Sequence, residues 1–155
     1  MNIEMQIILE VSNQAENFYE DALMLGDHAA YALKAGHRSQ MTGLENIAES
    51  ALKASDVLDY VKRQTARFSY WRQDFPHPEA APGSFGERLK VYLEVELAKK
   101  RDVICKDKLK IGNTTDEDRR IRRKVYLSLM RQFLRNMIAQ YEYRVSFDEK
   151  SKKGA

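Results

Sequence analysis

The 155-residue sequence is poor in residues that cross-link chains or interrupt helices. Its one cysteine, Cys105, cannot form an internal disulfide, which is typical of a reducing compartment. All three prolines lie in one stretch, FPHPEAAPGSFG. No apolar run approaches the roughly 20 residues of a membrane-spanning helix. The N-terminal MNIEMQIILE lacks the basic start and apolar core of a secretory signal. We therefore expect a cytoplasmic protein without membrane contact.

Charge of one sign is missing from two stretches. Residues 1–33 contain no Lys or Arg and carry net charge −6, so the rest of this +3 chain carries +9. Residues 119–141 contain no Asp or Glu and carry seven Lys or Arg. This asymmetry indicates an oriented molecule with an acidic and a basic region. The two regions either neutralise each other, within the fold or between copies packed head to tail, or leave the basic one free for an anionic polymer.

Apolar residues at helical spacing predict four long amphipathic segments, near residues 3–35, 39–68, 84–110 and 114–147. The second segment has apolar positions three and four apart from Leu44 to Phe68, typical of one helix with a coiled-coil-like seam. Ser84 with Glu87 can form a capping box, as can Thr114 with Glu117 or Thr115 with Asp118. These features predict an all-α fold, a helical bundle of four to six helices. We expect one domain over residues 1–147 and a disordered tail over 148–155.

Signatures of catalysis and of cofactors are scarce. His28, His37 and His77 share no ligand spacing with one another or with Cys105, so we expect no metal site. The sequence has no GxGxxG, P-loop or GxSxG, and we expect no cofactor and no enzymatic activity. One exception is RQDFPH, in which Arg72 and His77 form R-x4-H.

This pattern resembles the motif of helical HEPN ribonucleases, where the histidine would act as acid and base and the arginine would steady phosphate charge. In that family the motif starts a helix, whereas here it runs off a helix end. The alternative is a loop with a solvated histidine.

Basic and aromatic residues alternate in DYVKRQTARFSYWRQ, residues 59–73. Cations can contact phosphates and flat rings can stack on bases. The seam places Val61, Thr65 and Phe68 in the core, whereas Tyr60 projects outward and Tyr70 and Trp71 extend past the helix end. The acid-free helix over 119–141 is the stronger candidate for binding phosphates. The candidate nucleic-acid contacts are Arg38, Lys62, Arg63, Arg67, Arg72, Arg120, Arg123, Lys124, Arg131 and Arg135.

Two blocks resemble the small helical subunits of type III CRISPR effector complexes. The first is HRSQMTGLENIAESALKASDVLDYVKRQTAR, and the second is LMRQFLRNMIAQYEYR, with Tyr141 and Tyr143 at its end. The resemblance implies a non-catalytic α-bundle that stacks head to tail, presents basic faces to the crRNA–target duplex and bridges other subunits. It assigns these contacts to Arg38, Lys62, Arg63, Arg67, Arg131, Arg135 and Arg144. The acidic N-terminal segment, the proline-rich loop and the long third helix depart from that pattern.

Three hypotheses follow. The first is a non-catalytic subunit of a ribonucleoprotein complex that binds RNA or an RNA–DNA duplex through phosphate contacts. Its partners would be other subunits of the complex and, by head-to-tail self-association, further copies of itself. The second is an oligomerisation module that uses the seam from Leu44 to Phe68. The third is the HEPN-like ribonuclease.

Overall fold

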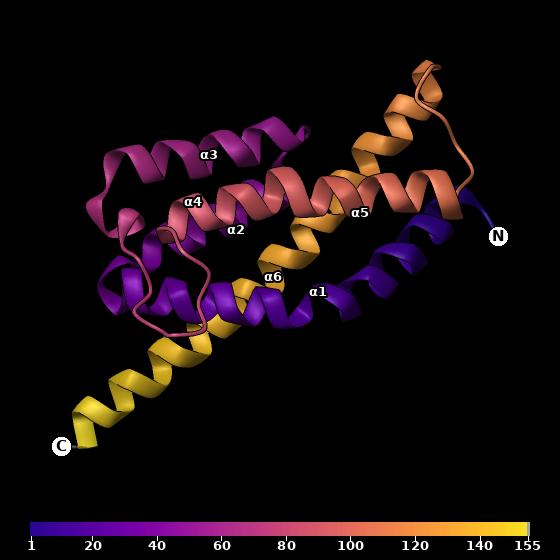
Figure 1. Ribbon diagram of the computed structural model, residues 1–155. Coiled ribbons are helices and arrows are strands. Elements are labelled where there is room, and N and C mark those ends of the chain that lie inside the picture. Colours follow the sequence, from indigo (N-terminus) through magenta and orange to yellow (C-terminus); the bar gives the residue numbers. More distant parts are fainter. Residues whose placement is uncertain (155) are drawn as a thin grey trace.

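The computed structural model describes residues 1–154, with side chains through residue 148. The helices are α1 (Ile3–Leu33), α2 (Arg38–Ser50), α3 (Ala54–Arg67), α4 (Phe85–Val91), α5 (Leu97–Val103) and α6 (Asp116–Gly154) (Figure 1). Across the described residues there is no strand, only one bridge between Asp74 and Ser84. The predicted all-α bundle is thereby confirmed. The expected tail over 148–155 lies almost entirely beyond the described side chains and stays a prediction.

The segment from α4 to α5 is one continuous rod that ends near Lys108. Two π-helical segments, Tyr92–Glu96 and Ile104–Lys108, follow α4 and α5. The wider π turn lets residues four apart stay on one face, and Leu89, Leu93 and Leu97 are all fully buried. If the continuous segment from α4 to α5 is counted as one helix, the described chain has five helices.

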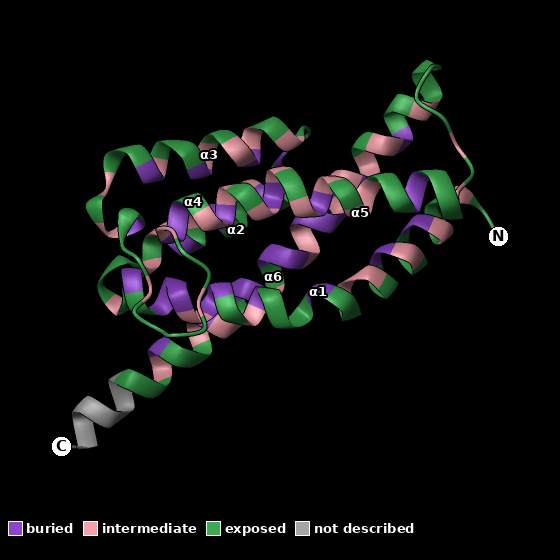
Figure 2. Ribbon diagram, in the orientation of Figure 1, coloured by how far each residue is buried: buried purple, intermediate pink, exposed green. Residues whose placement is uncertain are grey.

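The two longest helices, α1 and α6, run in the same direction, cross each other and form the centre of the core (Figure 1). Lys124 pairs with Glu4 near the start of both helices. At the other end of α1, the Tyr141 hydroxyl donates to the Lys34 carbonyl at 2.6 Å. The apolar stripe of α6, from Ile121 to Tyr141, is buried as expected (Figure 2). Where the helices cross, a Cβ on Gly26 would lie 2.6 Å from the Met137 carbonyl oxygen, so only glycine fits. None of the described helices, including the long α1, is long and apolar enough to cross a membrane.

The expected single helix over 39–68 is wrong, because the chain breaks after Ser50 and folds back as α2 and α3. Ala51 adopts an extended conformation at φ −64° and ψ 140°. The break exposes the last carbonyls of α2, and Arg131 of α6 satisfies two of them. Its Nε donates to the Ala48 carbonyl and its Nη2 to the Ala51 carbonyl, each at 2.8 Å. The seam therefore packs inside this chain, with Leu44 and Val61 fully buried.

The proline-rich loop is held against α1 by His28, which is fully buried. The His28 Nε2–H donates to the Gln73 carbonyl at 2.8 Å, and Nδ1 accepts from the Arg88 guanidinium at 2.8 Å. Phe75 and Phe85 pack against the imidazole, with ring centroids 5.3 and 5.6 Å away. This arrangement needs a neutral imidazole, and desolvation by burial lowers the His28 pKa accordingly.

Candidate nucleic-acid interface

The ten candidate cations do not form one face of the molecule. They fall into three groups: the C-terminal half of α3 with the turn after it, the contact between α2 and α6, and the start of α6. The C-terminal end of α3 and the start of α6 lie at opposite ends of the molecule (Figure 1). Sequence spacing could not reveal this separation, because it depends on how α3 is placed against α6.

In the α3 group, two of four cations are used within the fold. Lys62 pairs with Glu94 at 3.4 Å. Arg72 donates to the carbonyls of Thr65 and Ala66 at 2.8 and 3.0 Å and so caps the end of α3. The exposed side chains of Arg63 and Arg67 have no hydrogen bond or ion pair to any described residue, so both remain available to an anion.

The cations between α2 and α6 join those helices. Arg38 pairs with Glu142 at 3.2 Å. Arg135 contacts both carboxylate oxygens of Glu49, at 2.8 and 3.0 Å, and this hydrogen bonding lowers the Glu49 pKa. Together with Arg131, which caps α2, these residues stabilise the fold, so binding a phosphate there would require breaking existing contacts.

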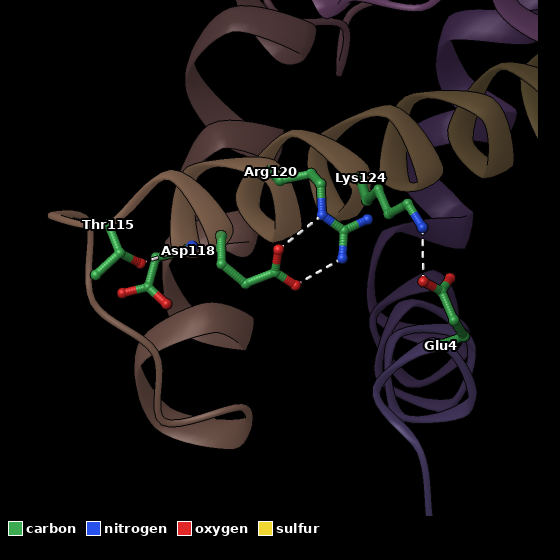
Figure 3. Close-up of polar contacts among 6 residues, drawn as sticks. Glu4, Thr115, Asp118, Arg120 and Lys124 are labelled. Atoms are coloured by element: carbon green, nitrogen blue, oxygen red, sulfur yellow. Dashed lines mark hydrogen bonds and ion pairs between the residues drawn. The ribbon is translucent and has the colours of Figure 1, made fainter.

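At the start of α6, two of the three candidate cations form ion pairs with carboxylates of the same chain (Figure 3). Arg120 contacts both oxygens of Glu117, at 3.0 and 2.6 Å. Lys124 reaches across to Glu4 of α1 at 2.6 Å. The third, Arg123, is exposed and makes no polar contact with the described residues. Thr115 directly precedes α6, and its Oγ1 accepts the Asp118 backbone N–H at 3.0 Å. Of the two capping alternatives, Thr115 with Asp118 is therefore the pair that the structure uses, through this one hydrogen bond.

Positive charge is also in excess in the segments that surround this end. Residues 99–124, here called the basic end, hold eleven Lys or Arg against five Asp or Glu, a net charge of +6. Because the whole chain carries +3, everything outside the basic end sums to −3. The basic end comprises the last part of the α4–α5 rod, the connection to α6 and the first turns of α6 (Figure 1).

A depression of about 210 Å³ opens in the basic end, here called the arginine depression. Its lining contains four arginines, an asparagine, a tyrosine and no acid: Arg101, Asn113, Arg119, Arg122, Arg123 and Tyr126. Of these, only Arg123 was among the predicted contacts. The spacing of 119, 122, 123 and 126 does indicate a shared helix face, but Arg101 joins them only through the packing of α5 on α6.

The aromatic residues of the stretch 59–73 are less available than expected. Trp71 lies past the end of α3, as expected, but it is not available to a base: it is fully buried, and its Nε1 donates to the Gln40 side chain at 3.1 Å. The Tyr60 hydroxyl donates to the Gln40 carbonyl at 3.0 Å, and Tyr70 stacks on His37 with centroids 3.7 Å apart. These rings complete the packing of α3 and do not form an open platform for bases.

The residues proposed for ribonuclease chemistry line different depressions. Arg72 borders one between α3 and α4, with its Nη1 on backbone carbonyls. His77 borders another depression, beside α1. Its ring is stacked with that of Phe75, and its Nδ1 accepts the Glu79 backbone N–H at 3.2 Å. Among the described residues, no three His, Cys, Asp or Glu side chains gather to hold a metal ion.

Another depression, of about 480 Å³, is lined by apolar residues and by Asp21, Glu79, Glu87 and Glu96, with Arg88 as its cation. That charge balance disfavours phosphate. Comparisons of the chain with protein-family models, with curated proteins and with solved structures found no match.

Proposed function

We propose that this protein is a non-catalytic RNA-binding and assembly subunit of a ribonucleoprotein complex, similar to the small subunits of type III CRISPR effectors. It contacts the backbone of RNA or of an RNA–DNA duplex through its basic end. The observation that carries this proposal is the net charge of +6 over residues 99–124 in a chain of net charge +3. Neutralising several phosphates releases counterions, and a concentrated patch of cations favours that release.

Binding through the basic end would be independent of sequence. Arginine and lysine contacts to phosphates carry no base information. The aromatic ring that lines the arginine depression, Tyr126, is occupied: Arg101 lies over it at 4.8 Å, and its hydroxyl donates to the Leu93 carbonyl at 2.7 Å. Base stacking on this ring would first require displacing Arg101.

The acidic side of α1 supplies the docking surface for a neighbour in this proposal. Glu4 and Asp27 are used within the chain, on Lys124 and Arg144. Glu10, Glu16 and Glu20 make no ion pair with any described residue. They can face a basic surface on another subunit or the basic end of a second copy, in a head-to-tail arrangement.

The test is a fluorescence-anisotropy titration of an RNA duplex with 5′-hydroxyl ends, at about 50 and 200 mM salt. We expect measurable affinity at low salt and a loss of about tenfold or more at the higher concentration. Replacing Lys106, Lys108 and Lys110 of the basic end with Gln should weaken binding more than replacing Arg63 and Arg67 with Gln. Absent binding at low salt, or affinity indifferent to salt, would contradict the proposal.

A second candidate is a protein-interaction module. The seam from Leu44 to Phe68 is used inside the chain, but the first turns of α1 expose a different apolar patch. Met5, Ile8 and Leu9 are 55, 66 and 47% exposed. Light scattering with and without nuclease separates the two functions: a nuclease-sensitive mass indicates nucleic acid, whereas a nuclease-resistant oligomer that Ile8→Ser dissociates indicates an interaction module.

A further inference from the structure

The arginine depression gathers cations more closely than a solvated helix face requires. Arg101 Nε and Arg122 Nη2 both contact the same oxygen of Asp102, at 3.0 and 2.6 Å. These two nitrogens therefore lie within about 5.6 Å of each other, the sum of those distances. Their side chains are only 24 and 20% exposed, so water screens their mutual repulsion less than at an open surface.

The other two arginines come from the same face of α6. Arg119 contacts Asp116 and donates to the Thr114 carbonyl, which positions its guanidinium at the rim. Arg123 makes no polar contact with any described residue. The hydroxyl of Tyr126 and the packing of Arg101 on its ring hold the floor of the depression in place.

The local charges do not balance. Four guanidinium groups line the depression, and the carboxylates that contact them are Asp102 and Asp116, which leaves a local charge of +2. Burial opposes ionisation of Asp102, but hydrogen bonds from Arg101 and Arg122 outweigh it and lower its pKa, so Asp102 is already ionised at neutral pH. A ligand that carries about two negative charges would balance this remaining +2.

We propose that the arginine depression is a binding site for a phosphomonoester dianion. A terminal phosphate carries a charge of about −1.5 to −2 at pH 7 and three acceptor oxygens, which matches the residual charge and the guanidinium donors. A phosphodiester in a nucleic-acid backbone carries one charge and would leave part of the excess unmatched. The chemistry is shared by free phosphate, by a mononucleotide and by the 5′-phosphate of an RNA strand.

This inference deepens the proposed function by naming a ligand class within the basic end, but it does not depend on backbone binding. The two can fail separately. The site is tested with inorganic phosphate and with adenosine 5′-monophosphate against adenosine, whereas backbone binding is tested with RNA that has 5′-hydroxyl ends. Comparing that RNA with its 5′-phosphorylated form tells whether the phosphate can be presented by a strand.

The experiment is isothermal titration calorimetry of the full chain at pH 7.5 and low salt. We expect inorganic phosphate and adenosine 5′-monophosphate to bind while adenosine does not. If adenosine 5′-monophosphate binds more tightly than inorganic phosphate, the natural ligand is the phosphate group of a nucleotide. If inorganic phosphate binds more tightly, the natural ligand is the free ion. Absence of binding by both phosphates overturns the proposal.

The decisive pair of variants is Arg123→Gln and Arg120→Gln. They remove the same charge from adjacent turns of α6, but Arg123 lines the depression and Arg120 is held by Glu117 outside it. We expect Arg123→Gln, and separately Arg119→Gln, to weaken phosphate binding about tenfold, and Arg120→Gln to weaken it less than about twofold. If Arg123→Gln and Arg120→Gln lose the same phosphate affinity, the phosphate responds only to the general positive charge of this region, and the proposed site is overturned.

Discussion

Arg131 lies in the middle of α6 and makes both of its polar contacts with backbone. Its guanidinium closes the C-terminal end of α2 through the carbonyls of Ala48 and Ala51. A helix end that turns sharply leaves carbonyls without partners inside the helix, and a charged donor satisfies them more strongly than a neutral one.

Replacing Arg131 with Gln should therefore destabilise the fold. We expect a loss of about 2 kcal/mol in the free energy of unfolding, because two charge-assisted hydrogen bonds disappear together. Urea denaturation monitored by circular dichroism measures this change. Arg63→Gln is the matched control, since this side chain is exposed and makes no hydrogen bond or ion pair with the described residues; a similar loss there would contradict the capping role.

His28 makes the fold sensitive to acid. Its pKa is lowered, chiefly by desolvation, so the folded state holds the imidazole neutral to a lower pH than the unfolded chain does. The stability that this contributes is complete above the unfolded pKa of about 6.5 and is lost as the pH falls through the folded pKa. Protonation would also set a cation against Arg88, which donates to Nδ1.

We accordingly expect the free energy of unfolding to fall between about pH 7.5 and pH 5 by more in the parent than in His28→Gln. Glutamine can still donate to the Gln73 carbonyl but does not titrate. Urea midpoints at the two pH values measure the difference. An equal acid-induced loss in parent and variant would show that His28 does not carry the effect.

At the scale of elements, the α3–α4 contact depends on the absence of one side chain. A Cβ placed on Gly86 would lie 2.0 Å from the Thr65 hydroxyl oxygen and 2.8 Å from Thr65 Cβ. Both residues are buried, so neither helix can move aside without disturbing the core.

Gly86→Ala should therefore cost about 2 kcal/mol of stability, even though alanine favours the helical conformation more than glycine does. Thermal and urea denaturation give the value. Gly36→Ala is the control, because no atom lies within 4 Å of its Cβ position, and we expect a change within about 0.5 kcal/mol. Equal effects at the two glycines would mean that the close approach of α3 and α4 is not required.

At the scale of the whole molecule, the charge distribution predicts self-association that depends on salt. Glu16 and Glu20 lie on α1 without a partner among the described residues, while the basic end holds the excess of cations. Copies that dock head to tail through these charges should attract one another at low ionic strength and separate as salt screens the attraction.

The weight-average mass in light scattering should therefore rise as salt is lowered, and Glu16→Gln with Glu20→Gln should reduce that rise. Replacing Glu45 and Asp59 with Gln and Asn removes the same charge from α2 and α3 and serves as the control. If both double variants behave alike, net charge alone explains the association and the acidic side of α1 is not a docking surface.

Local patterns in the sequence determined the helices and their starts. The stripe from Ile121 to Tyr141 repeats at helical spacing and is buried as predicted, because one apolar face must leave water whatever it packs against. Ser84 and Thr115 accept the backbone N–H groups of Glu87 and Asp118, as their spacing predicted. The all-α class follows from such regularities, since each depends on residues close in the chain.

Only the tertiary structure decided where the second segment breaks and which cations remain available. Apolar residues continue at spacings of three and four through Ala51, so the sequence pattern gives no sign of the break. Arg131, 80 residues away in the sequence, stabilises the break by donating to the Ala51 carbonyl. In the same way Arg135 is occupied by Glu49 and Lys124 by Glu4, whereas Arg101 of α5 joins Arg122 of α6 on one carboxylate. A charge acts through its distance to other charges, and those distances arise only when helices remote in sequence pack together.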